Sequence, residues 1–298
     1  MTSPQLEKSD YGEISLKRNP TSPRTLFGLV MSGIAGLFTL AAIIPLLIIL
    51  SYLITKGVSS LSAAVFTELP PPPLVDGGGF GNAILGTVLM VGIGALISIP
   101  LGIMAAIYLS EFNEGKVAEW IRFATNVLSG VPSIIVGVFA YGVIVLTFKS
   151  YSAWAGGFAL SILMLPIIVR TTDESLKLVP QDVRQASVGI GANQYQTVLQ
   201  VVLPAALPAI ITGITLAIAR AAGETAPLLF TALFTQFWPN WDALLVEPTA
   251  SLAVLVYNFA IVPFKNQQEL AWGAAFILVM LVLFTSILSR IATAKRTY

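Results

Sequence analysis

The most costly charges in this sequence are Arg220 and Glu224, which lie within the apolar stretch Pro208 to Phe234. Each ion at the centre of a bilayer costs about 2.5–3.5 kcal/mol on insertion scales, so both side chains must face protein or water. Because they are four residues apart, they can pair on one face of a helix. A guanidinium at this depth could guide an anion, while the carboxylate would partly neutralise the charge of the guanidinium. The alternative is a neutralised ion pair that only fixes helix packing.

A second candidate for anion binding is the run Gly130-Val-Pro-Ser133. Pro132 has no backbone donor and Ser133 can cap a new helix, which predicts free N–H groups at Ile134 and Ile135. Helix starts of this kind attract anions, so Ser133 is a candidate pathway residue. The alternative is a proline kink at the entrance to a membrane span, because membrane helices often carry prolines for packing.

Several kinds of chemistry are excluded by composition. The chain has no cysteine and no histidine, so disulfides, thiolate nucleophiles, cysteine zinc sites and histidine proton relays are ruled out. No Gly-x4-Gly-Lys-Ser/Thr run is present, and that loop holds the nucleotide phosphates in P-loop enzymes. We therefore expect no catalytic residue, no metal and no cofactor bound by this chain, and no ATP hydrolysis by the chain itself.

The elements that must position these residues are membrane helices. Hydrophobic residues make up 56% and charged residues 10% of the 298 positions, against roughly 25% charged in soluble domains. Six apolar stretches approach the length of about 20 residues that crosses a bilayer as a helix. They are Phe27 to Leu53, Ala83 to Leu109, Val131 to Phe148, Ala153 to Val169, Pro208 to Phe234 and Ala271 to Ser289. The sequence thus predicts an all-α polytopic membrane protein with six transmembrane helices.

The distribution of basic residues predicts the orientation. In the six-span scheme, 12 of the 16 Lys and Arg residues fall on one side, which the positive-inside rule makes cytoplasmic, together with both termini. Only Lys56, Lys149 and Lys265 fall on the other side, and Arg220 lies within a span. The predicted division is a cytoplasmic tail over residues 1–26, a first transmembrane helix over 27–54, an external loop over 55–80, a transmembrane domain over 81–290 and a cytoplasmic tail over 291–298.

Two further segments have helical periodicity. Residues 117–128 are amphipathic and are predicted to lie in the plane of the membrane interface. Residues 180–204 form a polar hairpin, in which small and apolar residues recur at helical spacing before Gly191 and again after it. Gly191 is placed where a helix would end in a left-handed turn. Leu203-Pro204 marks re-entry into the membrane. The hairpin is either a surface that another protein docks on or an amphipathic hairpin lying on lipid.

The hairpin resembles the loop by which permease subunits of ABC importers contact their ATPase. That pattern begins Glu-Ala-Ala, places Gly six positions after the Glu, and closes with an aliphatic residue, a free position, Leu and Pro. Here Gln185 stands for the Glu and Ser187 for the second Ala. The resemblance assigns ATPase coupling to Gln185, Ala186, Ser187, Gly191, Leu203 and Pro204.

A narrower resemblance is to permease subunits of bacterial phosphate ABC importers, the PstA type. It lies in Ala219-Arg-Ala-Ala-Gly-Glu-Thr-Ala-Pro-Leu-Leu-Phe230, with Gly130-Val-Pro-Ser-Ile134 and Tyr108-Leu-Ser-Glu111. It implies a type I ABC importer fold in the bacterial inner membrane and a phosphate pathway at Arg220, Glu224, Thr225 and Ser133. It also implies a sister permease subunit, a dimer of ATP-binding subunits that uses the ATP, and an external phosphate-binding protein. Membrane lipid is expected around the helices, and nucleic acid is not an expected partner.

Three alternatives remain open. Within the same class, the substrate could be another oxyanion such as sulfate or phosphonate. A secondary transporter could use Glu224 as its proton carrier and Arg220 as its substrate anchor, but the hairpin would then have no purpose. A membrane scaffold without transport would explain the hairpin and leave the charges within the span unexplained.

Overall fold

A computed structural model describes residues 22–112, 115–243 and 246–294 of the chain. The chain divides into two compact units, Met1–Tyr52 and Leu53–Tyr298, and each is described by itself. In the first unit, the described residues are almost entirely one helix, the first part of α1 (Pro23–Ser59). Its apolar side chains are exposed nearly throughout, which suits a helix surrounded by lipid or by another protein.

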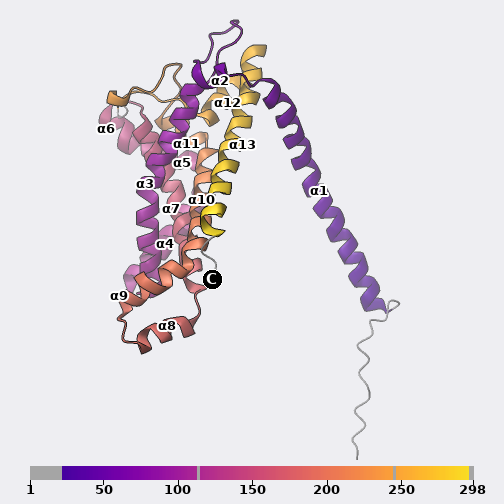
Figure 1. Cartoon of the computed structure of the whole chain (residues 1–298). Coiled ribbons are helices and arrows are strands. Elements are labelled where there is room, and N and C mark those ends of the chain that lie inside the picture. Colours follow the sequence, from indigo (N-terminus) through magenta and orange to yellow (C-terminus); the bar gives the residue numbers. More distant parts are fainter. Residues whose placement is uncertain (1–21, 113–114, 244–245, 295–298) are drawn as a thin grey trace, which may run out of the picture. The chain divides into compact units, whose positions relative to one another are not determined.

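The second unit is a bundle of long helices that run side by side (Figure 1). Its candidate membrane spans are α3 (Gly81–Glu111), α7 (Ala153–Lys177), the continuous helical run Gln194–Ala222, which ends in α10 (Leu203–Ala222), and α13 (Lys265–Ala294). Among the described residues, α1 is the fifth helix long and apolar enough to cross a membrane. A bent pair of shorter helices makes a sixth span if it is counted as one. The predicted all-helical membrane architecture is therefore confirmed.

The closest packing in the bundle is between α3 and α7. The Gly94 Cα position lies against the Gly157 carbonyl, and Gly102 lies against the side chain of Ile168. A Cβ at Gly102 would come within 2.7 Å of Ile168, so these glycines let the two helices approach closely. Met90, Leu160 and other fully buried side chains fill the seam. These two helices form the centre against which α10 also packs.

The predicted third span, Val131 to Phe148, is wrong as a separate crossing. The structure has α4 (Lys116–Gly130), followed by α5 (Ser133–Ala140), a π-helical turn η1 (Tyr141–Val145) and α6 (Leu146–Phe148). Only the two halves together are long and apolar enough to span, and they bend by 107°. Pro132 lies at this break, where it cannot donate the hydrogen bond that would continue a helix.

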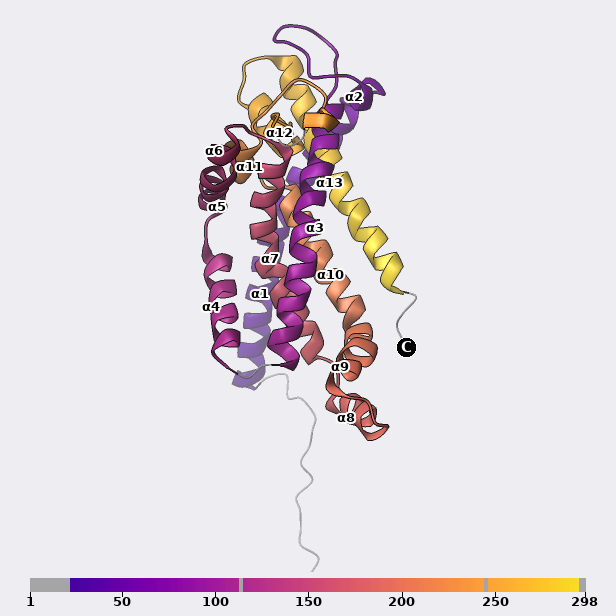
Figure 2. The ribbon, with the colours of Figure 1, turned by 90° about the vertical axis from the view of Figure 1, so that its left-hand side faces the viewer.

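The predicted interfacial helix at 117–128 is also wrong. It is α4, and Figure 2 shows it running alongside α7 rather than across the end of the bundle. Its buried Ala118 contacts the cluster formed by Leu109 and Val169. The large apolar side chains of α4, Val117, Trp120, Phe123 and Val127, remain exposed, so its packed face is formed by smaller or partly buried residues such as Ala118 and Ile121.

The predicted fifth span, Pro208 to Phe234, is interrupted. Helix α10 ends at Ala222, Gly223 caps it, and a new helix α11 (Ala226–Thr231) begins three residues later. Pro227 lies in the first turn of α11, where its missing N–H costs nothing, and it disfavours helical geometry in the residue before it. The continuous helix that the apolar composition suggested is therefore two helices with a break at 223–225.

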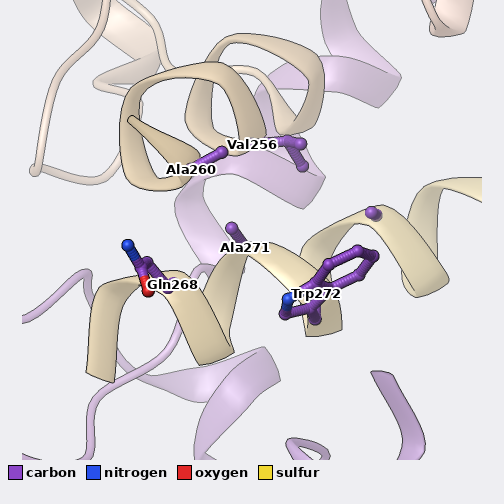
Figure 3. Close-up of a pocket in the computed structure, with 6 residues that line it drawn as sticks. Val256, Ala260, Gln268, Ala271 and Trp272 are labelled. Atoms are coloured by element: carbon purple, nitrogen blue, oxygen red, sulfur yellow. The ribbon is translucent and has the colours of Figure 1, made fainter. Parts of the chain in front are cut away.

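Short helices lie at the end of the bundle away from α8 and α9 (Figure 1). They include α2 (Ala64–Thr67), η3 (Trp241–Ala243) and α12 (Leu252–Ala260). The sequence predicts no membrane span over 240–269, and the structure places there α12, a buried helix that packs on α13 and α3. Between α12 and α13 lies a mostly apolar pocket of about 330 Å³ (Figure 3), where Gln268 donates to the Val262 carbonyl at 2.8 Å.

Candidate functional site

The first part of the site is the hairpin between α7 and α10, at the opposite end of the bundle from α2 and α12 (Figure 1). It consists of α8 (Gln181–Gly189), α9 (Gln194–Thr197) and the π-helical turn η2 (Val198–Val202). Gly191 has φ +93°, and its N–H donates to the Val188 carbonyl at 2.9 Å. The left-handed turn predicted at this glycine is confirmed, and it reverses the chain between the two arms of the hairpin.

The two arms of the hairpin are joined by an inner seam. The hydroxyls of Ser187 and Thr197 lie 3.0 Å apart, and both residues are buried. Asn193 caps α9 by accepting from the Gln196 N–H at 2.9 Å, and the Gln196 side chain accepts in return from the Asn193 N–H. Ser187, assigned to ATPase contact by resemblance, therefore faces the inside of the hairpin.

The outer face of the hairpin is apolar and exposed. Ile190 is 89% exposed, and Gln185 and Ala186 are exposed beside it on α8. The other exposed large apolar side chains in and just before the hairpin are Leu178, Val183, Val188, Tyr195 and Leu199. A concentration of exposed apolar side chains in an otherwise polar segment is typical of a protein interface. The sequence predicted helices over this segment from its periodicity, but the periodicity did not indicate which side chains would point outward.

The hairpin is rooted in the bundle by a small apolar cluster. Leu176, Val179, Val202, Ala206 and Ile210 are buried together, and the half-buried Leu203 packs against them. Pro204 is exposed and occupies the first turn of α10, as expected for a re-entry point. Of the two residues assigned to coupling here, Leu203 anchors the hairpin and Pro204 begins the membrane helix.

The second part of the site is the break between α10 and α11. Arg220 lies in the last turn of α10, and Glu224 follows the cap residue Gly223. The Arg220 Nε donates to Glu224 Oε1 at 3.5 Å, the long limit for a hydrogen bond. The Arg220 side chain is 58% exposed and that of Glu224 17%. The predicted pair is present, but it spans a helix end rather than one face of a continuous helix.

Thr225 and Ser133 stand at the starts of two helices that pack together. Thr225 is the N-cap residue of α11, and α11 contacts α5 where Pro227 lies against Gly137. Ser133 is the first residue of α5, after Pro132 as N-cap, and makes no capping hydrogen bond. The predicted cap at Ser133 is therefore wrong, because the Pro132 carbonyl already accepts the Ile135 N–H at 3.0 Å. Among the described residues, no hydrogen bond joins Ser133 to Arg220 or Glu224.

No group of three His, Cys, Asp or Glu side chains is placed to hold a metal ion within the part of the chain that the structure describes. The chemistry that this arrangement offers is that of a partly covered guanidinium, a carboxylate and two hydroxyl side chains at the ends of broken helices. Such groups can contact an oxyanion through hydrogen bonds.

Solved structures of ABC transporters share this fold. The methionine ABC transporter MetNI, in inward-facing conformations, matches with a TM-score of 0.58 and 19% identity over 73% of this chain and 94% of that one. A bacterial alginate ABC transporter matches with a TM-score of 0.62 and 14% identity over 91% and 98%. At these identities the likeness concerns the fold.

Sequence relatives are much closer. The phosphate transport system permease protein PstA of Yersinia pestis is 43% identical over 82% of both chains. That of Haemophilus influenzae is 41% identical over 88% of this chain and 92% of the relative. The family described as binding-protein-dependent transport system inner membrane component matches residues 98–297. The chain therefore belongs to this family of inner-membrane permease subunits, in its PstA group, and is the membrane component of an ABC transporter whose ATP is hydrolysed by a separate subunit.

Proposed function

We propose that this chain forms, with a sister permease subunit, the pathway through which inorganic phosphate is imported. The observation that carries the proposal is the partly exposed Arg220 at the break between α10 and α11, in a chain 43% identical to a phosphate permease. A planar guanidinium matches the geometry of phosphate oxygens, and it stays charged at every physiological pH.

The exposure of Arg220 supports a pathway role. A guanidinium that is 58% exposed on a membrane helix cannot face hydrocarbon without a cost of several kcal/mol, so it faces water or a partner protein. Within the described residues its only hydrogen-bonding partner is Glu224, through one long bond. Most of its donors therefore remain available to an anion. Thr225 and Ser133 are the proposed neighbouring polar contacts.

The hairpin is the proposed docking surface for a dimer of ATP-binding subunits. Ile190 is exposed at the turn between the two arms of the hairpin, on a frame held by the inner seam and by the apolar root. Closure of the ATPase dimer would then displace the hairpin and move the membrane helices between outward and inward openings. An external phosphate-binding protein would deliver the substrate at the opposite end.

The proposed orientation places the hairpin and both termini in the cytoplasm. Arg184 lies on α8, in the hairpin, whereas Lys149 directly follows α6 and Lys265 begins α13, at the opposite end of the bundle (Figure 1). This distribution agrees with the positive-inside rule. Reporter tags near Gln194 and at both termini should read cytoplasmic. Tags near Asp76 and Glu247 should read external, and an external reading at Gln194 would overturn the docking proposal.

The deciding experiment is uptake of labelled phosphate into vesicles that contain the complete complex, with the binding protein supplied on the outside. We expect uptake that requires ATP and is not reduced by excess sulfate or phosphonate. ATP-independent uptake driven by a proton gradient would instead favour a secondary transporter. Uptake blocked by excess sulfate would assign the chain to another oxyanion.

A further inference from the structure

Beneath the docking face of the hairpin lies an arginine that the docking motif does not include. Arg184, on α8, forms an ion pair with the Glu111 carboxylate at the far end of α3. The same guanidinium donates to the carbonyl of Leu176, in the last turn of α7, at 2.7 Å, and to that of Val179 at 3.4 Å. Its side chain is only 16% exposed. One guanidinium thus joins the ends of α3 and α7 to the hairpin.

The second arm of the hairpin holds the same end of α3. Gln194, at the start of α9, donates its side-chain N–H to the Glu111 main-chain carbonyl at 2.8 Å. Tyr195 packs on Phe112, with ring centroids 5.3 Å apart. Glu111 is 7% exposed at its side chain, and its other carboxylate oxygen accepts from the Ser110 hydroxyl at 3.0 Å. Both arms are therefore fixed to one residue.

These contacts have the properties of a rigid joint. Bonds between ionised groups are shorter and stronger than neutral ones, and a low-dielectric site strengthens them further. The planar guanidinium of Arg184 donates to Glu111, Leu176 and Val179 at once. A lysine ammonium in its place could not keep all three bonds. Because α3 packs closely on α7 through its glycines, any displacement of its end reaches the centre of the bundle.

We propose that Glu111 and Arg184 are positioning residues that make the hairpin and α3 move as one body. Displacement of the hairpin by the ATPase is thereby transmitted to the α3–α7 pair instead of being lost as bending of the hairpin. This inference rests on the proposed function in that it takes the hairpin to be the ATPase docking surface.

The joint can be tested directly by distance measurement. The chain has no cysteine, so Met104→Cys on α3 and Gln181→Cys on α8 would carry its only two spin labels; both side chains are exposed. In the assembled complex, we expect the label distance to be the same in the nucleotide-free and ATP-trapped states. With Arg184→Gln added, the distance should change between the two states. A clear shift in the complex without Arg184→Gln would overturn the proposal.

Coupling provides a second test with a matched control. In Arg184→Gln and Glu111→Gln complexes we expect roughly tenfold less phosphate moved per ATP hydrolysed, with the ATPase still copurifying. The control is Arg170→Gln with Glu174→Gln, which removes an Arg–Glu pair from α7 that is 71% and 62% exposed. It should keep the parental ratio, because exposed pairs contribute little.

The variants separate this proposal from the docking proposal. If Arg184→Gln does not assemble, Arg184→Lys keeps the charge and loses the fork, and an intermediate transport ratio is expected. A parental ratio of phosphate moved per ATP hydrolysed in an assembled Arg184→Gln or Arg184→Lys complex would overturn the proposed joint. It would leave the proposed docking surface unaffected. Failure of the docking proposal would appear differently, as unchanged ATPase binding when the outer face is altered at Ile190.

Discussion

An arginine–glutamate pair joins the hairpin to α3, another lies at the α10–α11 break, and the two pairs differ in sequence separation, exposure and number of partners. Arg184 and Glu111 are 73 residues apart in sequence, and their side chains are 16% and 7% exposed. Arg220 and Glu224 are one helical turn apart, are 58% and 17% exposed, and are joined by one bond of 3.5 Å. Every guanidinium nitrogen of Arg184 donates to a partner, whereas among the described residues only the Nε of Arg220 does.

This difference separates a structural charge from an available one. A buried ion pair with several additional hydrogen bonds fixes the geometry of the elements it joins, and losing one partner strands the other. Arg220, exposed in the last turn of α10 and held by one long hydrogen bond, is not fixed in this way, which is why we propose that it contacts the substrate.

The largest effect is expected at the α10–α11 break. Arg220→Gln together with Glu224→Gln keeps the break neutral, so the complex should assemble and retain ATPase activity. Phosphate transport should fall about 100-fold, because hydrogen bonds to charged groups contribute about 1.5–3 kcal/mol and each 1.4 kcal/mol is tenfold. The measurement is uptake of labelled phosphate by vesicles that contain equal amounts of assembled complex.

The single change Arg220→Gln is a weaker test, because it leaves the Glu224 carboxylate without its cation. Loss of transport in that variant would fit either a packing or a pathway role. The double variant distinguishes the two roles. Near-parental uptake by a properly assembled complex would mean that Arg220 and Glu224 serve only helix packing.

The two regions also differ in how far the sequence could predict them. The turn at Gly191 was predictable, since a glycine that ends a short periodic segment signals a left-handed residue. The Arg220–Glu224 pair was predictable for the same reason, because a four-residue spacing is local. The Arg184–Glu111 contact was not, since no local pattern links residues that only the packing of α3 against the hairpin brings together.

Breaks within apolar stretches were the main errors. Composition gives Pro208 to Phe234 as one span, because a single Gly223 is tolerated in membrane helices and Pro227 can begin a helix as easily as interrupt one. Pro132 could likewise begin or interrupt a helix, and the amphipathic segment before it, α4, was predicted to lie in the membrane interface. Helix α12 was missed because a helix of nine residues is too short to span, and its burial in the bundle became visible only with its neighbours in place.

The outer face of the hairpin should show the next largest effect. Ile190→Asp adds a charge to the side chain that we place at the centre of the ATPase contact, and loss of a central contact costs about 2 kcal/mol or more, roughly 30-fold in affinity. ATPase retained on the purified permease would be the readout. Leu74→Asp is the matched control, since Leu74 is 87% exposed at the other end of the bundle, and it should retain the ATPase fully.

A smaller effect is expected at the turn. An added Cβ meets nothing within 4 Å at either Gly189 or Gly191, so the two positions differ in backbone conformation alone. At the positive φ of Gly191, alanine costs about 1–2 kcal/mol. Gly191→Ala should therefore weaken ATPase association by about tenfold. Gly189→Ala, inside α8, should leave it unchanged or slightly improved. Equal behaviour of the two variants would mean that the turn does not shape the docking surface.

The smallest effect is expected at the inner seam, where the structure and the resemblance assign different roles to Ser187. The Ser187 hydroxyl is buried against that of Thr197, so Ser187→Ala leaves the Thr197 hydroxyl without this partner. The hairpin, and with it ATPase binding, should thereby lose about 1 kcal/mol of stability. Adding Thr197→Val removes both hydroxyls and should recover most of the loss, since replacing both partners with apolar groups is nearly neutral. If Ser187 contacted the ATPase directly, the second substitution would restore nothing. Titration of the ATPase against the two variants therefore decides whether Ser187 belongs to the frame of the hairpin or to its docking face.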